Sequence, residues 1–394
     1  MIRNNKIAVF IGDYFWSSAP YDGLNLYHEL AASDLNVELL MFDRDIRLNK
    51  KFSGNEKFYF NKDFFTKVKN LKTLKSWDEL IKVSKDYSLI ISSAHVAPKT
   101  RYPQNLHLLK CKWAAWDIGG VDLLVYATPD NQIRMSAPNY FFLKGESWVK
   151  WISEIKGEDK IDYAFASGCP HYDYYLDDAD LKYGKPLSKN EFILKYNLNK
   201  NKNFILVTPS NPAAPKHGEQ FDENEHALSF LNDKSCKYNT EILLKTYPHD
   251  YVFNEAESLY SGIYRRQFYK GKTSQYEYIK KVYPNIKVID SQDHFAAVKY
   301  CQKVFNISGS SISWETYFTE SKVFSMNYSN KQYFNSLSYL PNIQFPDKSM
   351  NHEIFKVEDI FNNAEVDKTS CKNFILKEFS LRNIKKILLT KIFK

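Results

Sequence analysis

Short apolar runs, separated by polar loops and helical repeats, mark the first half of the chain. The opening run, Lys6–Ile11, is followed by a polar loop and then by apolar residues at helical spacing over 24–32. Strands are predicted at 6–11, 37–42, 88–92, 111–116 and 163–167. Because strand, loop, helix and strand follow one another in this order, the pattern predicts a parallel sheet covered by helices.

The same alternation returns in the second half. Strands are predicted at 203–208, 241–245, 286–289, 303–307 and 322–326, and helices at about 222–233, 274–283 and 293–301 and from the loop 308–311 to Phe318. We therefore expect an α/β protein with two Rossmann-like domains that face each other across a cleft, with ligands at the carboxyl ends of the strands.

Length and composition divide the chain further. Its 394 residues exceed one ordinary domain. The stretch between the two halves is polar and rich in Asp, Lys and Asn, which is typical of a linker with one short helix. The expected parts are a first Rossmann-like domain over 1–176, a linker over 177–200, a second Rossmann-like domain over 201–370 and a basic amphipathic helix over 371–394.

Charge and cysteine usage narrow the class of protein. The net charge is +8, but the segment 371–394 alone holds seven Lys and Arg against Glu378, so the rest is near neutral. This distribution argues against nucleic-acid binding, which needs a basic stripe on the fold itself. The five cysteines are dispersed without a C-x-x-C pair, as in a reducing compartment. The N-terminal apolar run is too short for a signal peptide and no stretch approaches 18 apolar residues, so we expect a cytoplasmic protein.

The strongest candidate for a ligand site is the loop between the strand that ends at Ile307 and the helix that follows. The loop consists of Ser308, Gly309, Ser310 and Ser311. Backbone N–H groups at such a helix start attract a phosphate, and Glu315, one turn into the helix, is placed to accept from a ribose or sugar hydroxyl. The alternative is a serine helix cap with Glu315 as partner of the helix dipole.

Two other loops of the second domain carry compatible groups. Lys245 and His249 follow a strand and suit a phosphate or a leaving group, with His249 as charged donor or general acid, although a surface histidine fits as well. Thr208 and Ser210 lie in the first loop of this domain and offer hydroxyl donors. In the first domain, Asp13 and Asp117 are candidates to take a proton from an attacking hydroxyl, although each also fits a turn residue bound to its own backbone.

Two passages carry a family resemblance. Phe165–Asp173 resembles the G-x-P-x-x-D segment of GT-B enzymes of bacterial surface-polysaccharide synthesis. The paired serines, Glu315 and the strand within 320–327 resemble the serine and glutamate segment of the same group. That group includes capsule Kdo transferases, bacterial sialyltransferases and CDP-glycerol glycerophosphotransferases. Its His-Pro motif matches Tyr247-Pro-His249 only loosely, because the order here is Pro-His.

The resemblance implies a metal-independent GT-B glycosyltransferase without a cofactor, whose first domain binds the acceptor and whose second binds the nucleotide sugar. The implied donor is a CMP-linked 3-deoxy-ulosonic acid (Kdo, sialic-acid-like or pseudaminic-acid-like), and the acceptor a bacterial surface glycan such as capsule or lipopolysaccharide, free or lipid-linked. Alternatives are a CDP-polyol phosphotransferase, a UDP-sugar transferase or epimerase, and a non-catalytic sugar-binding protein. Asp43 and Asp45 spell a D-x-D motif, but they follow only the second strand, so we expect no metal site there.

The C-terminal segment predicts an amphipathic helix. Leu381, Ile384, Leu388 and Ile392 recur at helical spacing, interleaved with lysines. Two compatible uses follow from this pattern. The helix can cross back to pack on the first domain, and it can rest on anionic lipid at the inner face of the cytoplasmic membrane.

Overall fold

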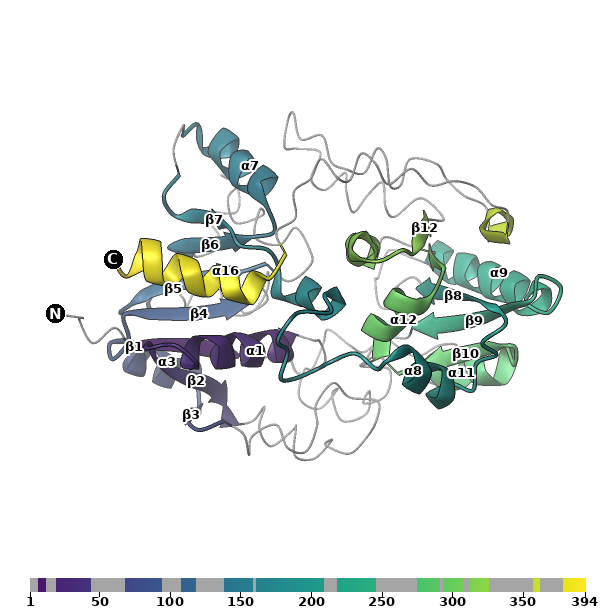
Figure 1. The fold of residues 1–394 in the computed structure, drawn as a ribbon, viewed down its shortest axis with the longest axis horizontal. Helices are drawn as coiled ribbons and strands as arrows, with labels where there is room; N and C mark the ends of the chain where they lie inside the picture. The colour runs from purple at the N-terminus through teal and green to yellow at the C-terminus, as the bar shows by residue number, and fades with distance from the viewer. Residues whose placement is uncertain are drawn as a thin grey trace. The chain divides into compact units, whose positions relative to one another are not determined.

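The computed structural model divides the chain into two compact units, Met1–Lys185 together with Phe374–Lys394, and Pro186–Asn373. The described residues are 6–11, 19–43, 68–93, 108–117, 138–158, 161–208, 218–245, 275–290, 293–307, 312–325, 357–361 and 378–394. Each unit is built around one parallel sheet, as Figure 1 shows.

The first unit contains a seven-stranded sheet in the order β3-β2-β1-β4-β5-β6-β7, with every neighbouring pair parallel. Its strands are β1 (Lys6–Ile11), β2 (Asn36–Phe42), β3 (Leu71–Leu74), β4 (Leu89–Ser93), β5 (Lys112–Trp116), β6 (Tyr140–Leu143) and β7 (Ala164–Ala166). Its helices are α1 (Ala19–Ala31), α3 (Trp77–Ser84), α7 (Glu146–Lys156), the 3-10 helix η2 (Pro170–Tyr175) and α16 (Ser380–Ile387). The order reverses between β1 and β4, the place where doubly wound sheets bind ligands.

The apolar runs explain why this sheet forms. Residues 7–11 of β1 and 89–93 of β4 are buried throughout, as expected for central strands covered on both faces. On one side, Phe10 and Phe42 meet the ring of Trp77 from α3 in edge-to-face geometry. Helix placement therefore follows the same apolar pattern that fixes the strands.

A buried carboxylate fastens α16 to the rest of the first unit. Asp173 Oδ1 accepts from the backbone N–H of Ser380 at 2.9 Å and from its hydroxyl at 2.6 Å, and Oδ2 accepts from the N–H of Leu381 at 3.1 Å. These bonds satisfy N–H groups that the start of a helix leaves without intrahelical partners. The helix packs on α1 (Figure 1), where Lys385 forms an ion pair with Glu29. The described part of the tail thus crosses back onto the first unit.

The second unit contains a five-stranded parallel sheet in the order β10-β9-β8-β11-β12. Its strands are β8 (Asn203–Thr208), β9 (Thr240–Lys245), β10 (Ile286–Ile289), β11 (Lys303–Asn306) and β12 (Lys322–Ser325). Its helical segments are α8 (Lys189–Lys195), α9 (Gly218–Lys234), α11 (Gln275–Val282), α12 (His294–Tyr300), α13 (Ile312–Glu315), η5 (Thr316–Phe318) and η6 (Val357–Phe361). Its core gathers apolar side chains of β8, β9, β10 and β11 with those of α9 and α11.

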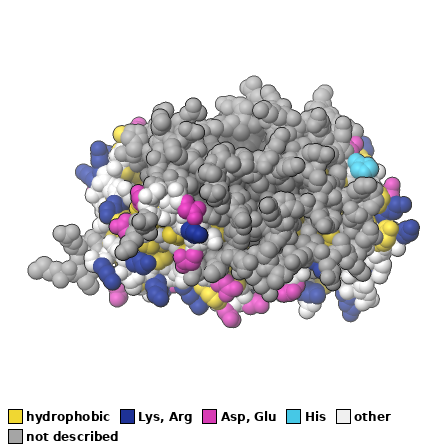
Figure 2. All heavy atoms as spheres, turned by 90° about the horizontal axis from the view of Figure 1, so that it is seen from above, with side chains coloured by type: hydrophobic (Ala, Val, Ile, Leu, Met, Phe, Trp, Pro, Cys, Tyr) yellow, Lys and Arg dark blue, Asp and Glu magenta, His cyan; other side chains and the backbone are white. Residues whose placement is uncertain are grey.

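The structure confirms the α/β fold class and the strands predicted from the sequence. It adds β3, β6, α3 and α7 in the first unit, which the apolar pattern did not predict. The short helix expected in the polar stretch is α8, which begins with a complete capping box between Ser188 and Glu191. No helix among the described residues is long and apolar enough to cross a membrane. On the face shown in Figure 2, the described basic and acidic side chains are interspersed.

Candidate functional site

The carboxyl edge of the second sheet carries a polar pair at its switch point. Thr208 ends β8 and Asn306 ends the neighbouring β11, and the two are register partners. The Thr208 hydroxyl donates to the side-chain oxygen of Asn306, and both residues are buried. The order of the sheet reverses between these two strands, so the pair lies where a doubly wound fold opens to a ligand.

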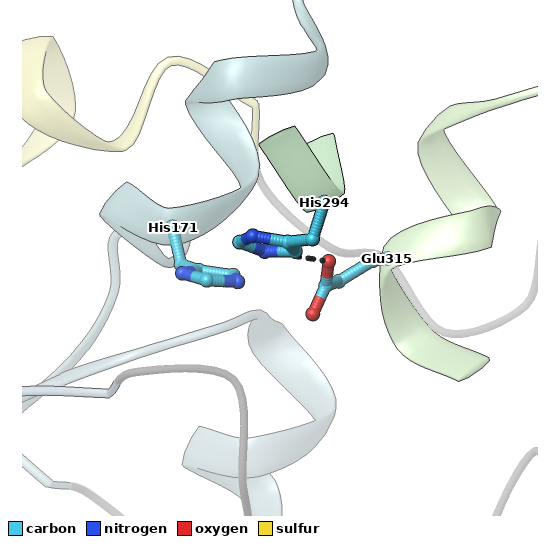
Figure 3. Close-up of side chains that lie close together, drawn as sticks. All are labelled: His171, His294 and Glu315. Carbon is cyan, nitrogen blue, oxygen red and sulfur yellow. Dashed lines mark ion pairs between the residues drawn. The ribbon is translucent and has the colours of Figure 1, made fainter. Parts of the chain in front are cut away.

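Three titratable groups lie near this edge of the second unit. Glu315, the last residue of α13, and His294, the first residue of α12, are both buried, and His294 Nε2 lies 3.5 Å from Glu315 Oε2 (Figure 3). Lys245 ends β9. Desolvation lowers the pKa of its ammonium group, while the negative charge of Glu315 acts in the opposite direction. One carboxylate thus interacts electrostatically with two basic side chains. This arrangement suits a ligand that carries both hydroxyl and phosphate groups.

The imidazole and carboxylate are also ligand types that a metal ion accepts. His294 and Glu315 together offer one nitrogen and one oxygen. A catalytic zinc site usually takes three ligands from protein, so this pair alone falls short of one.

An ion-pair cluster holds the start of α12 in place. Lys195, the last residue of α8, lies 2.7 Å from Asp293 and 3.0 Å from Asp290, and the Tyr196 hydroxyl donates to Asp293 at 2.5 Å. Although desolvation opposes the shift, these carboxylates raise the pKa of Lys195. Because Asp293 directly precedes His294, the polar stretch predicted as a linker fixes the position of a site residue.

A second polar cluster lies at the carboxyl edge of the first sheet. Asp117 follows β5 and Lys144 follows β6; both side chains are buried, with Lys144 Nζ 3.5 Å from Asp117 Oδ2. The Cys169 thiol donates to the backbone oxygen of Asp117 at 2.8 Å. Burial and then the charge of Asp117 raise the pKa of this thiol well above its usual value. The cysteine therefore stays protonated and acts as a donor that anchors the loop.

His171 and Asp22 extend this cluster toward α1. His171 Nδ1 lies 4.0 Å from Asp22 Oδ2, and Asp22 is buried. Tyr174 shares a hydrogen bond with Asp22, and its hydroxyl accepts from Asn25 Nδ2 at 3.2 Å. Desolvation first, and the charge of Asp22 second, raise the pKa of Tyr174, so the phenol remains neutral.

The predicted site residues are placed only in part. Thr208, Lys245 and Glu315 are described in the second unit, where Glu315 influences Lys245 electrostatically; Asp117 is described in the first. The remaining candidates, Asp13, His249, Ser210, Ser308, Gly309, Ser310 and Ser311, lie outside the described residues. In sequence, the Gly/Ser loop runs between the described end of β11 and the start of α13. Of the D-x-D pair, Asp43 is described and Asp45 is not.

Sequence reasoning missed four residues of these clusters. His294 follows the loop after the strand predicted at 286–289, and His171 lies within Phe165–Asp173, a passage used only for the family resemblance. Lys144 directly follows a strand, so its position in the sequence could have marked it as a candidate site residue. Asp22 looks like an ordinary residue of a first helical turn, so its burial was not predictable.

Comparisons with known proteins agree on the fold. Neither a protein-family model nor a curated protein sequence matches the chain. The structure is similar to UDP-GlcNAc 2-epimerase from Methanocaldococcus jannaschii, with 11% identity, a TM-score of 0.56, and 98% of this chain and 99% of that chain covered. It is also similar to the wall teichoic acid polymerase TagF, with 14% identity, a TM-score of 0.50, and 99% and 89% covered. The chain therefore has the two-domain GT-B fold, as the sequence predicted.

Proposed function

We propose that this protein is a metal-independent glycosyltransferase of GT-B type. It moves a 3-deoxy-ulosonic acid from a CMP-activated donor onto a bacterial surface glycan. The GT-B fold supports a nucleotide-sugar substrate, and the paired serines with Glu315 support the CMP-linked class by resemblance. The single observation that carries the proposal is the group Lys245, Glu315 and His294 at the carboxyl edge of the second sheet.

The second unit binds the donor in this proposal. Glu315 accepts from hydroxyl groups of the nucleoside or sugar, and Lys245 opposes the charge of the phosphate. Thr208 and Ser210 contribute hydroxyls, the loop 308–311 contributes backbone N–H groups, and His249 assists the leaving group. Fixed donors of this kind stabilise the departing phosphate without a metal ion or another cofactor.

The first unit supplies the acceptor side. An inverting transfer needs a group that takes the proton of the attacking hydroxyl. The buried cluster around Asp117, at the carboxyl edge of this sheet, supports this role, because it contains acid–base side chains. Asp13 is the sequence-based candidate for the same step.

The donor assignment is tested by thermal shift with CMP, CDP, UDP, GDP and ADP, with and without Mg²⁺. A nucleotide at 100 times its dissociation constant stabilises by about 2.7 kcal/mol, so binding is readily visible. We expect a response to CMP that does not need Mg²⁺ and that Glu315→Gln weakens. The exposed Glu320→Gln in the same unit is the matched control. A thermal shift with UDP alone would contradict the CMP assignment. No shift with any of the five nucleotides would contradict the proposed transferase activity.

A UDP-sugar 2-epimerase is the second candidate. The observation in its favour is the similarity over 98% of the chain to the epimerase from Methanocaldococcus jannaschii. The two activities differ in stoichiometry, because an epimerase needs no acceptor and does not release its nucleotide. Nucleotide release that depends on an added glycan acceptor supports the transferase, whereas isomerisation of a UDP-sugar without acceptor supports the epimerase. Transfer of a polyol phosphate would also release CMP, but it would require a CDP-linked donor.

The tail supports a location at the inner face of the cytoplasmic membrane. On α16 and the π-helical segment η8 (Leu388–Ile392) that continues it, Lys386, Leu389 and Lys391 are exposed, with Leu389 43% accessible. Cationic side chains around an exposed leucine suit an anionic lipid surface, where each Lys or Arg contributes about 1 kcal/mol. A lipid-linked acceptor would be reached there.

A further inference from the structure

The helix α12 is fastened to the end of α8 at a point next to the candidate donor site. We infer that Lys195 and Tyr196 are positioning residues for the donor nucleotide, which they do not touch themselves. They hold the start of α12 in place, and with it His294 beside Glu315. The inference rests on the proposed function and names residues outside the donor site that set its affinity.

The carboxylate of Asp293 is the centre of this connection. Its Oδ2 accepts from the Tyr196 hydroxyl at 2.5 Å and from Lys195 Nζ at 2.7 Å. Hydrogen bonds with a charged partner are stronger than neutral ones, and the Asp293 side chain is only 7% exposed, so little water competes for them. Two such bonds on one oxygen fix the residue that directly precedes His294 in the chain.

The start of the helix shows that this carboxylate serves α8 and not its own helix. Asp293 stands at the N-cap position of α12, where an aspartate usually accepts from a backbone N–H of the first turn. Its side chain makes no capping bond to the described residues of α12. The acceptor that would cap the helix is therefore used to tie two helices together.

The same two side chains also hold the residue that follows β10. The backbone N–H of Asp290 donates to the Tyr196 hydroxyl at 2.9 Å, and its carboxylate lies 3.0 Å from Lys195 Nζ. The N–H of Asp293 donates in turn to the backbone oxygen of Asp290 at 2.9 Å. The end of the strand and the start of the helix are thus fixed by one pair of residues.

Both side chains retain the proton that these bonds need. Desolvation first, and the charge of Asp293 second, raise the pKa of the Tyr196 phenol, so its hydroxyl remains a donor. Although desolvation opposes the shift, the neighbouring carboxylates raise the pKa of Lys195. The connection therefore persists through the neutral pH range.

The two helices meet again at the other end of α12, which packs on α8 (Figure 1). The buried ring of Phe192 lies 5.2 Å from that of Tyr196 and 6.1 Å from that of Tyr300, between ring centroids. The Tyr300 hydroxyl donates to the backbone oxygen of Leu187 at 3.1 Å. Because one tyrosine hydroxyl lies next to His294 and the other at the far end of α12, their effects can be measured separately.

The test compares Tyr196→Phe with Tyr300→Phe as the matched control. Affinity for CMP is measured by calorimetric titration, and urea denaturation checks that both variants fold. Each variant loses one hydroxyl between the same helices, so both should unfold at a somewhat lower urea concentration than the wild type. Affinity for CMP should fall about fivefold in Tyr196→Phe and stay unchanged in Tyr300→Phe.

A double-mutant cycle with Glu315→Gln separates positioning from a general loss of stability. Changes in residues that act through one another are not additive, whereas independent changes add in free energy. If Glu315→Gln alone costs about tenfold in affinity, its combination with Tyr196→Phe should cost about 15-fold, and not the roughly 50-fold of independent effects. Its combination with Tyr300→Phe should cost no more than Glu315→Gln alone.

Lys195 supplies a second pair of variants. Lys195→Gln removes the ammonium group and should weaken CMP binding, whereas Lys195→Arg keeps the charge and should restore most of the affinity. Unchanged affinity in folded Tyr196→Phe and Lys195→Gln, or additive losses in the cycle, would overturn the inference.

The imidazole NMR signals of His294 report the positioning without any nucleotide. They are assigned by comparison with His294→Gln, and they should shift in Tyr196→Phe but not in Tyr300→Phe. Signals that stay in place in Tyr196→Phe would overturn the inference. A wild type that binds none of the five nucleotides would overturn the proposed function and the donor role of these residues with it, and the His294 signals would still show whether the positioning is correct.

Discussion

The two units treat buried charge in different ways. In the first unit, Asp117 is closed in with Lys144, so a carboxylate and an ammonium group neutralise each other. In the second, Glu315 lies 3.5 Å from His294 and acts electrostatically on Lys245, and desolvation lowers the pKa of the lysine. We expect the first arrangement to keep its charge and the second to change its protonation when a ligand binds. Two similar sheets therefore carry different buried charges: a fixed ion pair in the first unit and an adjustable charge in the second.

The largest expected effect breaks the fixed pair. Lys144→Met leaves Asp117 with an uncompensated buried charge, which costs about 3–5 kcal/mol of unfolding free energy. Urea denaturation measures this loss, and Asp117→Asn in the same chain should restore part of it.

The control is Lys150→Met in the neighbouring helix α7. Lys150 is 76% exposed and paired with Glu154 at 3.7 Å. Its loss should cost under about 1 kcal/mol, because exposed ion pairs contribute little. Equal effects of the two lysine substitutions would contradict the fixed-pair interpretation.

The second prediction tests whether the buried carboxylate of Asp173 stabilises the fold. Asp173 is buried, and desolvation raises its pKa although Ser380 opposes the shift. Asp173→Asn replaces one acceptor by an N–H donor facing Leu381, so we expect a loss of about 1–3 kcal/mol. Hydrogen exchange should accelerate at the start of α16, whereas the exposed Asp178→Asn should leave it unchanged.

The raised pKa also fixes a pH dependence. A carboxyl group whose pKa is higher in the folded than in the unfolded protein stabilises the fold at low pH, and that contribution is lost as the pH rises through the folded pKa. Replacement of Asp173 by Asn should remove this part of the slope from acid unfolding curves. A slope identical to that of the wild type would show that Asp173 titrates normally.

The third prediction tests the adjustable charge. Desolvation lowers the pKa of Lys245 and the charge of Glu315 partly opposes this shift, so Glu315→Gln should let the lysine lose its proton at a still lower pH. Affinity for CMP should fall about tenfold, equivalent to about 1.4 kcal/mol, and its decline on the alkaline side should begin earlier than in the wild type. Calorimetric titration from pH 6 to 9 measures both changes. Parallel pH curves would show that the two side chains act independently.

The smallest effect concerns the surface of the first unit. Lys386→Gln on α16 should weaken binding to vesicles containing anionic lipid about fivefold at low salt, since one cation contributes about 1 kcal/mol. Lys386→Arg keeps the charge and is the control. Binding that is insensitive to both salt and Lys386→Gln would show that this surface does not meet a membrane.

Much of the fold could be predicted from local sequence. Strands such as β1 and β8 are short, continuous apolar runs bounded by polar segments, a signal that needs no tertiary information. The edge strand β3 was not predictable, because in Leu71–Leu74 only the last residue is buried and the apolar pattern is correspondingly weak. The helix α7 ends at Gly157 with a φ of 65°, a helix-end signal that the apolar pattern alone does not use.

Positions next to strands and helices were the predictable part of the candidate site. Asp117, Thr208 and Lys245 stand at strand ends and Glu315 ends the helix after β11, as expected, while their roles stay predictions. The same reasoning did not find His294, whose position depends on the pairing of Lys195 with Asp293, almost 100 residues apart. Contacts between residues so far apart in sequence depend on the folded sheet, so no local sequence pattern predicts them.

The bond between Asp173 and Ser380 has a consequence for synthesis. The two residues are separated by 207 positions. At roughly 5–20 residues per second, a ribosome adds that length in about 10–40 s. During this interval the second unit is translated, and the carboxylate of Asp173 still lacks its partner. The first unit, although its sheet is translated first, is therefore completed after the second unit.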